Sequence, residues 1–102
     1  MTTIEKILNL KNQEGLTIKN YQIINYKTGW QVADYGVECK TAYDAIVAVN
    51  KFHGNCGIWL DNGVYYVDHS FRVKTKKEAL SIGREYNQIS ILKWSNMSLV
   101  YC

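Results

Sequence analysis

The residues that could bind a metal ion are few in this chain and widely spaced. The soft ligands are Cys39, His53, Cys56 and His69, and only His53 and Cys56 lie close together in the sequence. Structural zinc sites usually combine two close ligand pairs, such as C-x2-C with H-x3-H. We therefore expect no metal site, and we assign these four residues to separate structural or surface roles.

A catalytic site is not indicated either. Asp68-His69-Ser70 contains the residue types of a hydrolase triad, but neighbouring residues on a strand point to opposite faces. Cys56 could act as a nucleophile only if the fold places a histidine beside it. The chain has no P-loop, no nucleophile elbow and no Rossmann glycine pattern. We expect no catalytic residue and no cofactor, and we keep an enzyme that uses Cys56 with a histidine as the third hypothesis.

A basic cluster surrounds one predicted helix. Helix N-termini bind phosphate through their free N–H groups, and lysines add positive charge there. The overall charge of +3 is mild, so the same residues could simply form a solvated face. A nucleic-acid-binding module that uses this cluster and strand aromatics is the alternative hypothesis. Its predicted binding residues are Arg72, Lys74, Lys76, Lys77 and Arg84.

Aromatic residues are the other prominent feature, with three Trp, eight Tyr and two Phe. Trp and Tyr are enriched in the hot spots of protein interfaces. In the stretch 57–68, "GIWLDNGVYYVD", strand alternation places Tyr65 and Tyr66 on opposite faces. One face belongs under the helices, and the rings of the other face can meet a partner. The alternative is that these rings only complete a small core, or the core of a homodimer. The predicted partner-binding residues are Trp30, Trp59, Tyr65, Tyr66 and Trp94.

Local signals predict three helices. A threonine is followed three residues later by an acid at Thr2, Thr41 and Thr75, which is the pattern of a capping box. Apolar residues then recur at helical spacing, and the predicted helices cover about 3–13, 42–53 and 76–86. Gly15, Gly54 and Asn87 lie near the predicted ends.

A hairpin pattern follows each predicted helix. The first hairpin would join 16–26 to 30–39, the second turns at Asn62-Gly63, and the third turns at 95–97. The chain is therefore predicted to be α+β, with three αββ units at about 2–39, 41–69 and 75–102. An antiparallel sheet would pack against the helices, either in two layers or in a pseudo-threefold arrangement.

Length and composition predict a single domain over residues 1–102. No apolar run has the length of a membrane span, and the N-terminal residues do not form a secretory signal. Three cysteines give no disulfide framework, which is typical of a reducing cytosol. We therefore expect a cytoplasmic protein with no membrane partner.

One segment carries a resemblance. The stretch 78–91, "EALSIGREYNQISI", resembles small uncharacterised proteins of bacterial phages and mobile elements. The matching residues are Glu78, Ala79, Leu80, Ile82, Asn87, Gln88, Ser90 and Ile91. Such proteins are often anti-defence factors, including anti-CRISPR inhibitors, that bind and block a host enzyme. The resemblance carries over no catalytic residue.

Together these observations lead to one main hypothesis. The chain is a small non-enzymatic binding protein, encoded by a phage or mobile element, in the host cytoplasm. It would inhibit a host protein, such as a CRISPR-type defence nuclease, through an aromatic-rich and basic surface. A homodimer is compatible with the same residues.

Overall fold

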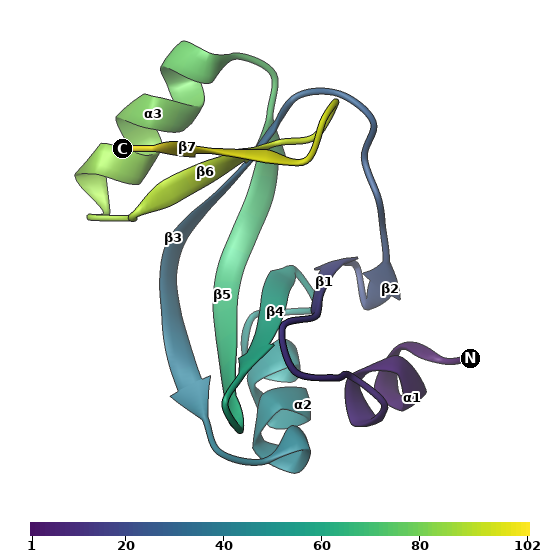
Figure 1. The fold of residues 1–102 in the computed structure, drawn as a ribbon. Helices are drawn as coiled ribbons and strands as arrows, with labels where there is room; N and C mark the ends of the chain where they lie inside the picture. The colour runs from purple at the N-terminus through teal and green to yellow at the C-terminus, as the bar shows by residue number, and fades with distance from the viewer. The chain divides into compact units, whose positions relative to one another are not determined.

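The computed structural model describes all 102 residues and confirms an α+β fold (Figure 1). The helices are α1 (Thr3–Leu8), α2 (Ala42–Lys51) and α3 (Lys76–Glu85). The strands are β1 (Gly15–Lys19), β2 (Gln22–Ile23), β3 (Trp30–Cys39), β4 (Cys56–Asp61), β5 (Val64–Val73), β6 (Ser90–Lys93) and β7 (Ser98–Tyr101). They form one sheet in the order β2-β1-β4-β5-β3-β6-β7.

The threonine caps form as predicted. The hydroxyl oxygens of Thr2, Thr41 and Thr75 each accept a hydrogen bond from the backbone N–H three residues later, at 3.1 to 3.2 Å. The reciprocal bond of a full capping box forms at Thr2, whose N–H donates to Glu5 Oε1. The second and third helices are each followed by two strands, as predicted.

The first predicted hairpin is wrong. The stretch 16–26 is not one strand, because the chain turns at Asn20-Tyr21 and splits it into β1 and β2. β1 pairs with β2 and β4, and β3 pairs with β6. The first helix is also shorter than predicted, since it ends at Leu8 and is capped by Asn9, whose side-chain amide donates to the Glu5 carbonyl.

The chain divides into two compact units. The first contains 1–24 and 36–69, and the second contains 25–35 and 70–102. The long strands β3 and β5 contribute residues to both units. The prediction of one domain over 1–102 stays a prediction.

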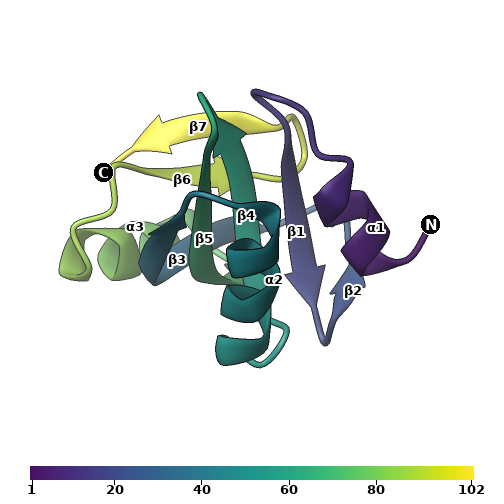
Figure 2. The same cartoon turned by 90° about the horizontal axis from the view of Figure 1, so that it is seen from below.

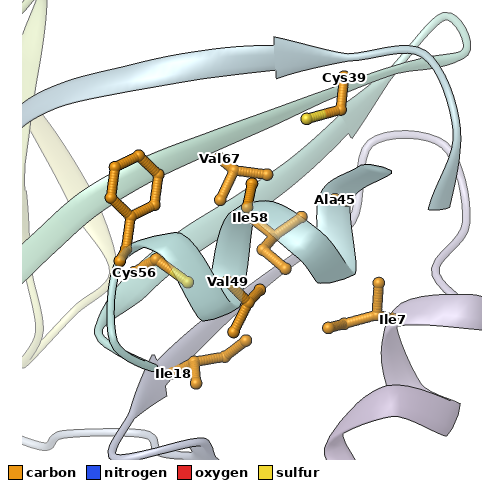
Figure 3. Close-up of a cluster of buried hydrophobic side chains, with 10 residues drawn as sticks. Ile7, Ile18, Cys39, Ala45, Val49, Cys56, Ile58 and Val67 are labelled. Atoms are coloured by element: carbon orange, nitrogen blue, oxygen red, sulfur yellow. The ribbon is translucent and has the colours of Figure 1, made fainter. Parts of the chain in front are cut away.

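The core of the first unit forms where α2 lies on β4 and β5 (Figure 3). α2 buries Ala45, Ala48 and Val49 in this core. The strands contribute Ile58 and Val67, and α1 contributes Ile7, as Figure 3 shows. α1 and α2 contact each other and lie on the same side of β1 and β4 (Figure 2). Burial in β4 follows the strand period of two, with Cys56, Ile58 and Leu60 buried and Trp59 exposed.

The second unit has its own smaller core. Val32, Val73, Ala79 and Ile91 are buried together, and Trp30, Leu80 and Val100 pack against them. Figure 1 shows α3 beside the hairpin of β6 and β7, and α3 contacts β6. None of the three helices has the length and hydropathy of a membrane span.

Candidate functional site

The predicted aromatic residues do not all reach the surface. Trp94 is only 4% exposed, and its indole N–H donates to Gln31 Oε1 at 3.1 Å. Its ring also meets Tyr26 edge-on, with 5.6 Å between the ring centroids. This burial argues against the predicted partner-binding role of Trp94, because the ring is already part of the packing of the second unit.

The other aromatic residues that were predicted to bind a partner lie in different surroundings. Tyr65 packs against the core of the first unit, whereas Tyr66 pairs across the strands with Trp59, which is exposed. The two tyrosines therefore lie on opposite faces of the sheet, as the strand alternation predicts. Trp30 is half-buried in the second unit, with Lys93 Nζ 5.8 Å from its ring centroid. The structure thus brings together Trp59 and Tyr66 among the predicted partner-binding residues.

The basic cluster contains one structural arginine. Arg72 Nε donates to the Thr28 carbonyl at 2.8 Å, and a second guanidinium nitrogen donates to Thr28 Oγ1 at 3.0 Å. The guanidinium also lies 5.4 Å from the Tyr26 ring centroid. These hydrogen bonds of Arg72 therefore hold the loop before β3 in place. The other predicted phosphate ligands, Lys74, Lys76, Lys77 and Arg84, are exposed.

Cys56 is poorly placed to act as a nucleophile. The residue is fully buried, and burial, with a smaller effect of the Asp68 charge, raises the pKa of its thiol to about 12. Catalytic cysteines need the thiolate, which is favoured by nearby positive charge and partial exposure. The His69 ring lies against Phe52, with 6.1 Å between the ring centroids. No three His, Cys, Asp or Glu side chains gather as a metal site would require.

The structure also shows a site that the sequence did not predict. This site is a groove between α1 and α2, with a volume of about 660 Å³. We call it the α1–α2 groove. Ile7 and Val49 are buried at its base, while Ile4, Tyr43 and Val47 are exposed along it. Its lining contains no charged side chain and consists of Thr2, Thr3, Ile4, Ile7, Tyr21, Tyr43, Ile46, Val47, Val49 and Asn50.

The groove exists because α2 is apolar on more of its surface than the sheet can cover. Tyr43, Ile46, Val47 and Asn50 follow the i, i+3, i+4, i+7 spacing of one helix face, and all four line the groove. A second face of the same helix is buried in the core of the first unit. Tyr43 stays 73% exposed and Val47 52% exposed, which is unusual for apolar helix positions.

Tyr21 forms a fixed wall of the groove. It occupies the second position of the two-residue turn between β1 and β2 with φ +65°, where glycine is the usual residue. Its hydroxyl donates to Asn50 Oδ1 at 3.0 Å, and its N–H donates to the Gly54 carbonyl at 3.1 Å. Its carbonyl accepts from Thr3 Oγ1 at 2.7 Å. Such over-determined, strained residues cluster at functional sites, because the surrounding bonds hold them in place.

A comparison of the chain with models of protein families, with curated proteins and with solved structures finds no match. The proposals below therefore rest on the geometry of the chain and on the resemblance of residues 78–91 to small phage proteins.

The contact between Gly54 and Tyr21 generates the first prediction. Gly54 has φ +74°, and a Cβ there would lie 2.6 Å from both Tyr21 Cδ2 and the Tyr21 backbone nitrogen. Gly54→Ala should lower the free energy of unfolding by about 3 kcal/mol, from the left-handed backbone and the clash together. Urea denaturation followed by circular dichroism measures this change.

Gly63→Ala is the matched control. Gly63 also has a positive φ, of +79°, but a Cβ there would meet no atom within 4 Å. This variant should therefore cost only the backbone term, about 1–2 kcal/mol. Equal losses for the two variants would show that the Tyr21 contact contributes nothing.

The second prediction concerns Asp68, whose pKa is raised by burial. The folded state therefore binds this proton more tightly than the unfolded state, so stability falls as pH rises from the ordinary carboxyl pKa to the folded one. Asp68→Asn should be more stable than the parent at neutral pH, and this gain should disappear in acid. Urea denaturation at neutral and acidic pH tests this, with Glu38→Gln as a control for an exposed carboxylate on β3. A gain that is independent of pH would contradict the prediction.

Proposed function

We propose that this chain is a non-enzymatic binding protein that receives the apolar face of a partner protein's helix in the α1–α2 groove. The uncharged lining, with its exposed tyrosine and aliphatic side chains, carries the proposal. The centres of protein interfaces are likewise poor in charge and rich in tyrosine.

The groove favours a helix with a continuous apolar stripe. An amphipathic helix inserts residues at i, i+3, i+4 and i+7 into a hydrophobic groove. Charged residues of the partner must stay outside, because no lining side chain could pair with them and burying an unpaired charge is costly. Thr2, Thr3 and Asn50 supply hydroxyl and amide groups that can bond the polar edge of such a helix.

We assign the partner to the host cell on the resemblance of residues 78–91 to anti-defence proteins. Binding of a helix from a defence enzyme, such as a CRISPR-type nuclease, would block that enzyme without chemistry. The protein would act in the host cytoplasm, and its three free cysteines suit a reducing compartment.

Val47→Asp tests the groove as the binding site. It places a charge in the uncharged lining while altering an exposed side chain, so the fold should persist. A partner captured by the parent protein from a bacterial lysate would be purified and titrated against each variant. Affinity should fall at least tenfold, which corresponds to about 1.4 kcal/mol.

The matched control is Ile89→Asp, which also changes an exposed β-branched aliphatic residue but in the second unit. It should bind like the parent. A photo-crosslinking amino acid at Tyr43 should also attach to a helix of the captured partner. Unchanged affinity of Val47→Asp, or failure to recover any stoichiometric partner, would overturn the proposal.

Binding of nucleic acid is the second candidate function, favoured by the exposure of three lysines around the start of α3. Lys74 precedes the Thr75 cap, and Lys76 and Lys77 form the first turn of the helix. Oligonucleotide affinity should then fall steeply with salt. Changing all three lysines to Gln should weaken binding and flatten the dependence of log K on log salt by about 0.9 per lost phosphate contact in duplex DNA. No binding of DNA or RNA at low salt would exclude this function.

A further inference from the structure

Strand β7 presents an open sheet edge. It lies at one end of the strand order, and Figure 1 shows it in yellow on the outer side of β6. Leu99 is 57% exposed and Tyr101 is 73% exposed. Natural proteins usually block such edges with lysine, proline or a bulge. The segment 95–102, "SNMSLVYC", contains no charged residue and no proline.

The direction of the backbone groups follows from the pairing of β7 with β6. The Cys102 N–H donates to the Ile89 carbonyl at 2.9 Å, and Val100 and Ser98 pair with Ile91 and Lys93 in the same register. Hydrogen-bonded pairs alternate along an antiparallel ladder, so Ser98, Val100 and Cys102 direct their backbone groups toward β6. Leu99 and Tyr101 therefore direct their N–H and C=O groups to the open edge.

We propose that two copies of this chain form a dimer by antiparallel pairing of β7 with β7, in a register centred on Val100. Leu99 of each copy then lies opposite Tyr101 of the other copy, and Val100 lies opposite Val100. The backbone groups of Leu99 and Tyr101 in both copies form four hydrogen bonds across the new pair. The sheet becomes continuous through the dimer.

The side chains favour this register over its neighbours. A slip by one residue would place the exposed side chains of one copy on the opposite face. A slip by two residues would leave a single hydrogen-bonded pair between the strands. The centred register instead sets Leu99 against Tyr101 twice, and aromatic–aliphatic neighbours stabilise strand pairs.

A second copy fits this edge because the strand is complementary to itself. No side chain of β7 is charged, so two copies bring no like charges together. The contact is the same patch on both copies, which closes with twofold symmetry and does not extend into fibres.

Disulfide trapping tests the register. In a Cys102→Ser background, Val100→Cys should form a covalent dimer in a glutathione redox buffer. The two Val100 Cα atoms form a non-hydrogen-bonded pair at about 4.5 Å, which a disulfide can span. Leu99→Cys is the control, because its two copies are offset by two residues and lie roughly 8 Å apart, beyond disulfide reach. Dimers from Leu99→Cys but not from Val100→Cys would overturn the register.

Sedimentation equilibrium tests the dimer without any new cysteine. The parent chain of 11.8 kDa should reach twice this mass as its concentration rises. Tyr101→Lys should raise the dissociation constant at least tenfold, because the lysines would lie in the new pair. Tyr86→Lys changes the exposed tyrosine that caps the C-terminus of α3 and should leave the dimer intact. A parent chain that stays monomeric at every concentration, or a Tyr101→Lys variant that dimerises as well as the parent, would overturn the proposal.

The dimer and the groove can be separated experimentally. Val47 belongs to the first unit and β7 to the second, so Val47→Asp should leave the dimer unchanged. Loss of partner binding with an intact dimer in Val47→Asp would support the groove, and loss of the dimer with intact partner binding in Tyr101→Lys would support the edge.

Discussion

The packing of α2 on the strands of the first unit is the interaction on which the candidate site depends. Ala45 and Ala48 are small and buried, so the helix axis can approach β4 and β5 closely. Phe52 is buried at the end of the helix, and the chain then reverses at Gly54. That reversal receives the Tyr21 ring and its N–H. The placement of α2 therefore determines both the packing of the core and the position of Tyr21, which forms the wall of the α1–α2 groove.

Two titratable residues of this unit, Cys56 and Asp68, have raised pKa values. Cys56 is held as a thiol by burial, and Asp68 has a raised pKa for the same reason. Both effects arise from desolvation, and neither residue has a nearby positive charge among the causes of its shift. A half-buried acid with a raised pKa costs stability at neutral pH, because its ionised form is partly desolvated.

The sequence predicted those features of the fold that interactions between neighbouring residues determine. The threonine caps place the helix starts, and Asn62-Gly63 forms the turn between β4 and β5. The break at Asn20-Tyr21 was not predictable, because the left-handed Tyr21 depends on Gly54 and Asn50, which are distant in sequence. The burial of Trp94 was not predictable for the same reason, since its partner Gln31 lies on β3, which is distant in sequence. The groove had a weak local signal in the excess of apolar residues in α2, but only the structure shows that α1 leaves that face open.

The two proposed contacts use different physical means of recognition. The α1–α2 groove would select side chains through shape and the absence of charge, whereas β7 would pair through backbone hydrogen bonds. A dimer formed through β7 would carry two grooves. If its target also presents two helices at a suitable spacing, the second binding event becomes intramolecular, and avidity can exceed the affinity of one groove by 10²–10⁴. The modest affinity of one groove would then be amplified by the dimer.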